Sequence, residues 1–434
     1  MPDTLTDLLA RGAAEAVAIA APGRQPLTHG ALRALIQRTL AVLNAGGIGR
    51  NDRVGIVLPN GPEMATCFMA CASGVASAPL NPAYRADEFE FYLSDLHAKA
   101  LIVETGSTSP AVEVAKKLGV AVIELQPAEA AGDFTLTGLP AGTPSAQGGY
   151  AQPADVSMVL HTSGTTSRPK IVPLSQGNLA ASAENIRATL QFTAADCGLN
   201  IMPLFHIHGL IAGVLAPLAA GSQVFCTPGF NALKFFGWMD EARPTWYTAV
   251  PTMHQAIIAR APKNLDVIAR HPLRFMRSSS SSMPPQVIAE LEAIFKAPLI
   301  EAYGMTEATH QMCSNPLPPA VRKPGSVGLP AGPEVAIMGE DGRLLPREKL
   351  ETLWQAHVQT GPMGYGYLFS VGDRPGRRFV GHNGGAPGIS AEFLHYPDHG
   401  LAIVVLANQD HAAEPMREWL QAQVEAALFG TETP

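Results

Sequence analysis

His161-Thr162-Ser163-Gly164-Thr165-Thr166-Ser167-Arg168-Pro169-Lys170 separates two apolar runs, one over 156–160 and one that opens at Ile171. Six of these ten residues carry a hydroxyl or are glycine, and the stretch ends in a lysine. Glycine lets the backbone approach a ligand closely, hydroxyls donate hydrogen bonds, and lysine adds a positive charge. The stretch therefore predicts a flexible loop between two strands that wraps a polyphosphate.

Two other interpretations of this loop are weaker. The usual P-loop is excluded because the spacing G-x-x-x-x-G-K-[ST] is absent. A polar surface turn is the alternative, but a turn rarely needs five hydroxyls, a glycine and a lysine in one run. Anion binding is favoured.

The composition is that of a packed globular protein. The 434 residues suggest two to three domains, and they are 47% apolar and 15% charged. The net charge is −7 and no basic block occurs, which argues against nucleic acid or an anionic membrane surface as the main partner. A nucleotide can still bind, because a local pocket matters more than the net charge. No particular oligomeric state is indicated.

Cysteine usage favours a cytoplasmic protein. The five cysteines are odd in number and match no zinc spacing, and free thiols fit a reducing compartment. The N-terminus lacks the pattern of a signal peptide. The most hydrophobic window, 209–221, is too short to span a membrane and predicts a buried helix.

Strand-like and helix-like segments alternate up to about residue 300, which predicts an α/β fold with doubly wound, mostly parallel sheets. In such folds ligands bind beyond the carboxyl ends of the strands, where the anion loop lies. Residues 127–153 are expected to form a long connecting loop or a lid. The expected helices are 31–45, 62–72, 85–97, 110–118, 178–192, 252–261 and 285–295, and the expected strands are 54–58, 76–80, 100–103, 120–125, 224–226, 246–250 and 273–276.

Three further segments contain candidate binding or catalytic residues. In 203–209, two histidines could form a metal pair, but no cysteine or carboxylate cluster supports this, so His206 is expected to line a pocket. The five serines at 278–282 could be a disordered linker, but their place between a strand and a helix favours an ordered loop. In 301–307, an aromatic ring, a glycine, a hydroxyl and a carboxylate could stack a base, hold a phosphate and bind Mg²⁺.

In this order and spacing, the four segments resemble motifs of the adenylate-forming superfamily, which includes acyl-CoA synthetases and luciferases. Thr162–Lys170 is similar to the family's phosphate loop, with Ser167 where glycine is usual. Tyr303–Glu307 is similar to its adenine and magnesium motif. The resemblance covers about residues 5–346.

The resemblance implies ATP, Mg²⁺ and CoA as cofactors, and it assigns roles to individual residues. His206 would line the acyl pocket, Thr306 would contact the α-phosphate, and Glu307 would carry Mg²⁺. Lys170, His206, Thr306 and Glu307 form the expected catalytic set. The expected nucleotide contacts are Thr162, Ser163, Gly164, Thr165, Thr166, Lys170, Ser279, Ser280, Ser281, Glu301, Ala302, Tyr303, Gly304 and Thr306.

Within the superfamily the chain looks most like the oxalate–CoA ligases, on the stretches 202–209, 225–236, 246–255 and 310–318. A small dicarboxylate needs polar pocket walls, whereas a fatty-acyl pocket would need apolar ones. Such walls are expected from His206, Ser280, Ser281 and His310. A small-molecule carboxylate such as oxalate is the expected substrate.

The family pattern stops after Pro346, because the ribose-binding Asp, the hinge and the C-terminal domain with its catalytic lysine are not found. Residues 347–434 resemble the end of serine β-lactamase-like hydrolases and predict a small α+β antiparallel-sheet segment. We expect a helix over 349–358, a strand over 365–369, a glycine-rich turn over 381–388, a hairpin of 392–396 and 401–406, and a helix over 415–428.

The chain is thus interpreted as two domains, an AMP-binding domain over 1–346 without its C-terminal subdomain, and a β-lactamase-like fragment over 347–434. An acid–CoA ligase impaired by that loss is the first functional hypothesis. A serine esterase or β-lactamase is the second, but its Ser-x-x-Lys motif occurs only at Ser167–Lys170, inside the anion loop. A non-catalytic nucleotide-binding chimera is the third.

Overall fold

A computed structural model describes residues 2–139, 142–162 and 169–335, and beyond them 358–360, 363–365, 370–372, 379–386, 389–396, 399, 401–407 and 413–429. The chain forms two compact units, Met1–Glu334 and Val335–Pro434.

The first unit contains a seven-stranded sheet with the order β7-β6-β5-β3-β4-β8-β9. Its strands are parallel except for the edge pairs β6–β7 and β8–β9. They are β3 (Arg53–Val57), β4 (Ala76–Pro79), β5 (Ala100–Glu104), β6 (Ala121–Pro127), β7 (Phe134–Thr137), β8 (Val156–Thr162) and β9 (Lys170–Ser175).

A second sheet of nine strands has the order β16-β15-β14-β13-β12-β10-β11-β1-β2. Its centre, from β14 to β1, is parallel. The predicted doubly wound, mostly parallel architecture is therefore confirmed. The strands are β1 (Val17–Ala20), β2 (Leu27–Thr28), β10 (Cys197–Asn200), β11 (Gln223–Cys226), β12 (Trp246–Ala249), β13 (Phe275–Ser278), β14 (Leu299–Met305), β15 (His310–Ser314) and β16 (Leu329–Pro330).

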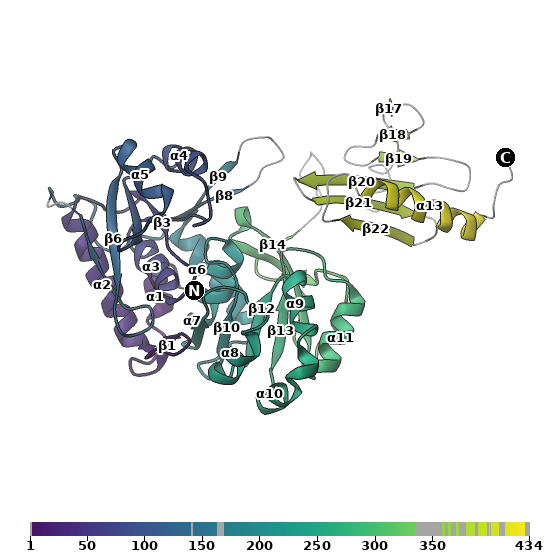
Figure 1. Cartoon of the computed structure of the whole chain (residues 1–434), viewed down its shortest axis with the longest axis horizontal. Coiled ribbons are helices and arrows are strands. Elements are labelled where there is room, and N and C mark those ends of the chain that lie inside the picture. Colours follow the sequence, from purple (N-terminus) through teal and green to yellow (C-terminus); the bar gives the residue numbers. More distant parts are fainter. Residues whose placement is uncertain are drawn as a thin grey trace. The chain divides into compact units, whose positions relative to one another are not determined.

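Helices fill three layers around the two sheets (Figure 1). The outer face of the seven-stranded sheet packs against α4 (Ala86–Asp95) and α5 (Pro110–Lys117). The layer between the sheets holds α1 (Leu5–Leu9), α2 (His29–Ala45), α3 (Pro62–Ala72), α6 (Gln176–Thr189), η1 (His208–Leu215) and α7 (Ala216–Leu218). The outer face of the nine-stranded sheet packs against α8 (Phe235–Ala242), α9 (Pro251–Ile258), α10 (Leu265–Arg270) and α11 (Pro285–Phe295), with the 3₁₀ turn η2 (Ala261–Lys263) between α9 and α10.

Helix α2 illustrates why the expected helices form. Its apolar side chains recur every three or four residues, so they share one face, and that face is buried between the sheets. The side chain of Thr28 caps the helix by accepting a hydrogen bond from the Ala31 N–H at 3.2 Å. Gly46 ends the helix, as its position after the last apolar residue predicts.

Two expectations for the first unit need correction. Residues 134–137 of the expected loop 127–153 form strand β7, because Phe134 is buried and the segment pairs with β6. The expected buried helix over 209–221 is instead a π-helix, η1, followed by one short turn of α-helix, α7. All eight residues of η1 are buried, as predicted, and π-helical turns often occur near functional sites.

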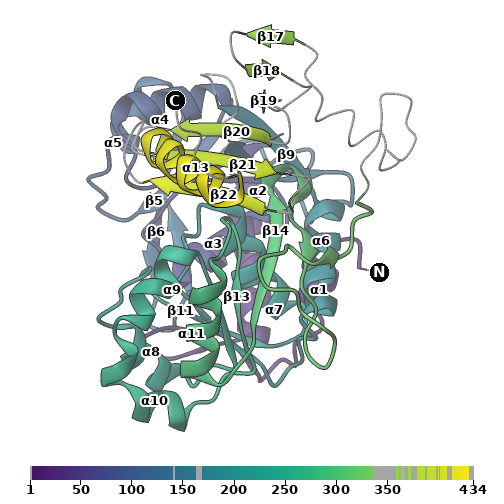
Figure 2. The same ribbon diagram turned by 90° about the vertical axis from the view of Figure 1, so that its right-hand side faces the viewer.

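The described residues of the second unit form a six-stranded antiparallel sheet and a helix that packs against β21 and β22 (Figure 2). This confirms the predicted small antiparallel segment, its hairpin and its closing helix. The elements are β17 (Val358–Thr360), β18 (Met363–Tyr365), β19 (Ser370–Gly372), β20 (Phe379–Ala386), β21 (Ile389–Tyr396), β22 (Leu401–Ala407) and α13 (Ala413–Phe429).

Local composition misleads at the glycine-rich segment of this unit. The turn expected over 381–388 is wrong for 381–386, because 379–386 form strand β20, whose residues 380–386 pair with β21; residues 387 and 388 lie outside the described residues. Tyr365, expected to begin a strand, instead ends β18, and residues 366–369 lie outside the described residues. The helix expected over 349–358 also lies outside them, except for Val358, which belongs to β17.

Across the described ranges, no helix combines the length and apolar character needed to cross a membrane.

Candidate functional site

The anion loop joins the antiparallel strands β8 and β9, as its flanking apolar runs predict. Thr162 and Lys170 face each other across the two strands. Lys170 is exposed at the start of β9. The predicted contacts Ser163, Gly164, Thr165 and Thr166 lie outside the described residues. The structure thus brings the two ends of the loop together.

Residues 301–307, the predicted adenine and magnesium segment, form the end of β14 and enter the turn to β15, which contains a 3₁₀ turn, η3 (Thr306–Ala308). Tyr303 is 46% exposed, so its aromatic side chain is available to a planar ligand. Gly304 permits the close approach of the two strands, because a Cβ atom there would lie 1.4 Å from the His310 carbonyl oxygen. This segment and the anion loop meet where the Thr162 hydroxyl donates to a Glu307 carboxylate oxygen at 3.3 Å.

A buried arginine lies at the centre of a polar cluster beside this turn. The Arg277 side chain is fully buried at the end of β13. Its Nη1 lies 3.2 Å from Nε2 of His208, and its Nη2 lies 3.2 Å from Nε2 of His310. Burial lowers the pKa of Arg277 to about 9, so the guanidinium still carries its charge at neutral pH. Within the described ranges, no carboxylate pairs with it.

The two histidines of this cluster stack on each other, with ring centroids 4.9 Å apart. Burial, followed by the charges of the neighbouring histidine and guanidinium, holds the pKa of His208 well below its ordinary value. Burial and the same guanidinium do so for the pKa of His310. Both rings are therefore neutral at physiological pH. His208 also contacts the hydroxyls of Ser280 (Nδ1, 3.1 Å) and Thr248 (Nε2, 2.7 Å).

A second chain of contacts holds the backbone of Arg277 in place. Nε2 of His254 lies 3.2 Å from the Arg277 carbonyl oxygen, and the Tyr247 hydroxyl lies 3.1 Å from Nδ1 of the same ring. Burial lowers the pKa of His254 to about 4, so this ring is also neutral.

Three buried polar atoms at the end of β13 have no hydrogen-bond partner within the described residues. They are Nε of Arg277 and the hydroxyls of Ser278 and Ser279. Buried polar groups are normally satisfied, so unpaired ones beside an uncompensated cation indicate a place where a polar ligand binds.

The predicted site residues fall into two groups. Ser279 and His310 are buried in or beside the cluster, and the exposed Ser280 contacts it through His208, whereas His206 and Ser281 are exposed and have no hydrogen bond to it among the described residues. Glu301 accepts a hydrogen bond from the Gly325 N–H at 3.0 Å, Ala302 is buried in the same strand, and Thr306 lies in η3.

Arg277, His208, Thr248 and Gln311, whose side-chain oxygen accepts a hydrogen bond from Arg277 Nη2 at 3.4 Å, were not predicted as site residues. The available signal for Arg277 was its place directly after the apolar pair Phe275-Met276 of an expected strand, since an arginine is costly to bury without a function. The pair at 206 and 208 was recognised, but the inner member, His208, is the one that joins the cluster.

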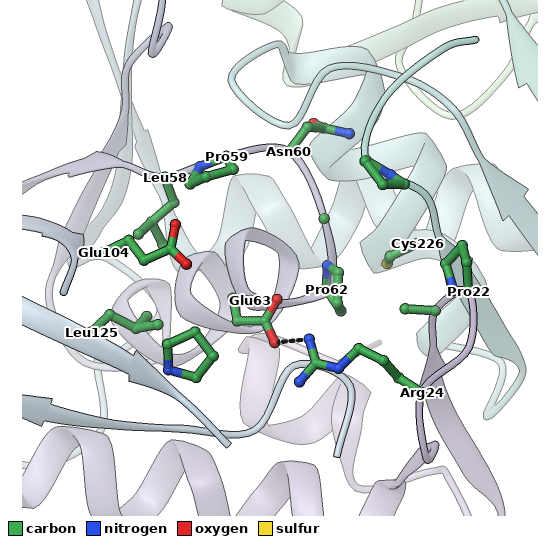
Figure 3. Close-up of a pocket in the computed structure, with 14 residues that line it drawn as sticks. Pro22, Arg24, Leu58, Pro59, Asn60, Pro62, Glu63, Glu104, Leu125 and Cys226 are labelled. Atoms are coloured by element: carbon green, nitrogen blue, oxygen red, sulfur yellow. Dashed lines mark hydrogen bonds and ion pairs between the residues drawn. The ribbon is translucent and has the colours of Figure 1, made fainter. Parts of the chain in front are cut away.

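A separate cavity of about 220 Å³ lies beyond the carboxyl ends of β3 and β5 (Figure 3). Arg24 and Glu63 in its wall neutralise each other at 2.5 Å, and the rest is largely proline and aliphatic side chains. The Arg277 cluster, with its uncompensated charge, therefore suits an anion better than this cavity does. The described residues contain no group of three or more His, Cys, Asp or Glu side chains that could hold a metal ion.

Comparison with known proteins identifies the family. Residues 8–355 match the family model "AMP-binding enzyme", and residues 331–428 match the family model "Beta-lactamase". An oxalate–CoA ligase of Arabidopsis thaliana is 43% identical over 358 residues, which are 79% of this chain and 68% of that protein. A probable CoA ligase of Humulus lupulus is 43% identical (78% of this chain and 66% of that protein), and an oxalate–CoA ligase of Saccharomyces cerevisiae is 36% identical (70% and 60%). The chain thus spans about two thirds of the length of these relatives.

Solved structures share the fold. ATP-bound MatB from Rhodopseudomonas palustris is 24% identical, with a TM-score of 0.69 over 95% of this chain and 90% of that chain. A benzoate CoA ligase from Burkholderia xenovorans LB400 is 19% identical, with a TM-score of 0.70 over 99% of this chain and 94% of that chain. The family match over most of the chain and the 43% identity lead to one conclusion: this chain is a member of the AMP-binding enzyme family.

Proposed function

We propose that this protein is an acid–CoA ligase that adenylates a small dicarboxylate, such as oxalate, and passes the acyl group to CoA. The observation that carries the choice of substrate is the buried, uncompensated guanidinium of Arg277. The free and buried cysteines fit a cytoplasmic location.

A dicarboxylate supplies the counter-charge that this guanidinium lacks. Burying an isolated charge is costly unless an opposite charge pairs with it. One carboxylate of the substrate would react, and the other would be held near Arg277 by the hydroxyl and imidazole groups that surround it. A monocarboxylate of the same size would leave the cation uncompensated. Ser280, Ser281, His206 and His310 would form the polar walls of the pocket.

The reaction proceeds in two displacements. A carboxylate oxygen of the acid attacks the α-phosphorus of ATP, the bond from that phosphorus to the bridging oxygen breaks, and pyrophosphate leaves. The CoA thiolate sulfur then attacks the acyl carbon of the acyl-adenylate, the C–O bond breaks, and AMP leaves. Positioning and charge stabilisation are the main contributions of the protein in both steps.

The chain offers groups for each part of the nucleotide. Tyr303 and Gly304 would frame the adenine, because the ring is exposed and the glycine leaves the strand surface open. Thr306 would donate to the α-phosphate. The β- and γ-phosphates would be held by Lys170 and the hydroxyls and amides of Thr162, Ser163, Gly164, Thr165 and Thr166.

Glu307 is the residue that would hold Mg²⁺. Its carboxylate faces the mouth of the anion loop through its contact with Thr162, and Mg²⁺ typically takes one or two protein carboxylates while keeping several waters. When bound, the ion would offset the negative charge of the phosphates. We further propose that both adenylation and thioester formation are slower than in a complete acid–CoA ligase, since residues 331–428 match the β-lactamase family and no family-type catalytic lysine is recognised after residue 346.

Pyrophosphate exchange tests this proposal directly. The chain is incubated with ATP, Mg²⁺ and labelled pyrophosphate, and with oxalate, malonate or glyoxylate, the last being close to oxalate in size but with one carboxylate. We expect exchange with oxalate well above that with glyoxylate. Lys170→Ala should abolish it, whereas Lys263→Ala, an exposed lysine in η2, should not. Equal exchange with glyoxylate would overturn the choice of substrate. No exchange together with no ATP-dependent thermal stabilisation would overturn the proposal as a whole.

A further inference from the structure

The contacts of the buried guanidinium determine where the protons lie on two histidine rings. A guanidinium nitrogen can only donate hydrogen bonds. Arg277 places Nη1 against Nε2 of His208 and Nη2 against Nε2 of His310, each at 3.2 Å. Both Nε2 atoms must therefore accept. Because both rings are neutral, each carries its one proton on Nδ1.

The opposite tautomer would not fit His208. A proton on Nε2 could be donated to Thr248 Oγ1 at 2.7 Å, but it would face an N–H of Arg277 at 3.2 Å. With the proton on Nδ1, the Thr248 hydroxyl and the Arg277 Nη1–H both donate to Nε2 and share its lone pair, and Nη1 also lies 3.5 Å from Thr248 Oγ1.

This assignment sets the direction of a hydroxyl at the edge of the cluster. The Nδ1–H of His208 donates to Ser280 Oγ at 3.1 Å, so the Ser280 hydroxyl hydrogen must point to another acceptor. Ser280 is exposed and adopts a left-handed backbone with φ 76°, which is unfavourable for a residue with a side chain. Strained backbone that persists at a polar site is commonly maintained for function.

We propose that Arg277 is a positioning residue that holds His208 and His310 in the Nδ1–H form. Through His208 it orients the Ser280 hydroxyl, which then donates to a carboxylate of the substrate. Only this last step rests on the proposed function, because the proton positions are a property of the free protein.

The tautomers are read by NMR on the full chain without substrate. Imidazole ¹⁵N-labelled protein is recorded at neutral pH in a long-range ¹H–¹⁵N experiment, and His208→Gln and His310→Gln assign the signals. We expect Nδ1–H patterns for His208 and His310. We expect the Nε2–H pattern for His254, which donates to the Arg277 carbonyl oxygen. An Nε2–H pattern or a charged ring at His208 or His310 would overturn the proposal.

Arg277→Met removes the two donors while keeping a long side chain. We expect His208 and His310 to lose their Nδ1–H preference, and His254 to keep its pattern, because its partner is the backbone of residue 277. The unchanged His254 signal is the internal control for folding. Unchanged tautomers at His208 and His310 beside an intact His254 signal would refute the role of Arg277. If this variant does not fold, Arg277→Lys is measured instead, and the wild-type pattern remains decisive by itself.

Two substitutions at His208 test the route to the substrate. Asn places an amide near the position of Nδ1 and can still donate to Ser280, whereas the longer Gln places its amide near Nε2. In pyrophosphate exchange, we expect His208→Gln to raise the KM for the acid about tenfold or more, without a similar change in the KM for ATP, and His208→Asn to raise it less. The reverse order would contradict the orienting role. If the wild type shows no exchange, the proposed function fails while the NMR result still decides the tautomers.

Discussion

Gly304→Ala should destabilise the nucleotide turn. A Cβ atom at this position would lie 1.4 Å from the His310 carbonyl oxygen and 2.4 Å from its carbonyl carbon, and backbone atoms cannot rotate away. The strands β14 and β15 must separate by about 1.6 Å before the distance from the added Cβ to the His310 carbonyl oxygen reaches even 3.0 Å. We expect loss of the pairing of Gly304 with Gln311 and of Met305 with His310.

The cost follows from that separation. Two ladder hydrogen bonds at about 1 kcal/mol each, plus about 1 kcal/mol of residual backbone strain, lower the free energy of unfolding by about 3 kcal/mol. With an m-value of about 3 kcal/mol/M, the urea midpoint falls by about 1 M. His310 moves with its carbonyl, so its contact with Arg277 and the stabilisation by ATP should weaken as well.

Urea unfolding of the full chain, followed by tryptophan fluorescence, measures the change. Gly237→Ala is the matched control, because Gly237 lies in helix α8 and its added Cβ meets nothing within 4 Å. Alanine should stabilise that helix by about 0.5–1 kcal/mol. A Gly304→Ala protein that unfolds at the wild-type midpoint and retains ATP stabilisation would refute the close-approach argument.

Three further predictions concern stability. Arg187 and then Arg11 hold the pKa of Glu184 at about 2 instead of 4.5, so the stabilisation by this carboxylate is present above pH 4.5 and is lost as the pH falls toward 2. In Glu184→Gln the free energy of unfolding should depend less on pH in that range, whereas Glu113→Gln, in an exposed ion pair, should leave the dependence unchanged. The free energy of unfolding of Ser280→Gly should exceed that of Ser280→Ala by about 1 kcal/mol, because only glycine adopts φ 76° without strain. Equal urea midpoints of the two variants would contradict this. Trp246→Ala removes a ring that is 1% exposed and should cost about 3–5 kcal/mol in urea unfolding, whereas Trp419→Ala, 63% exposed, should cost less than about 0.5 kcal/mol.

Patterns within one segment predicted most of the fold. The apolar periodicity of α2, and the short apolar runs that became β3, β5 and β6, are local signals, and they matched the structure closely. Predictions failed where pairing or burial overrode composition. The glycines of 381–385 form a strand because β21 pairs with them, and Phe134 draws its segment into the sheet edge because its ring is buried.

The sequence by itself determined the α/β class, the strand–loop–strand setting of Thr162–Lys170 and the motif at Tyr303–Glu307, because each depends on neighbouring residues. Only the tertiary structure showed that these two segments meet at Thr162 and Glu307, 145 residues apart. It also showed that Arg277 joins His208 and His310, 69 and 33 residues away. The physical reason is that these residues lie on separate strands and loops, Thr162 on one sheet and Glu307 beyond a strand of the other, and only the packing of the chain decides which of them touch.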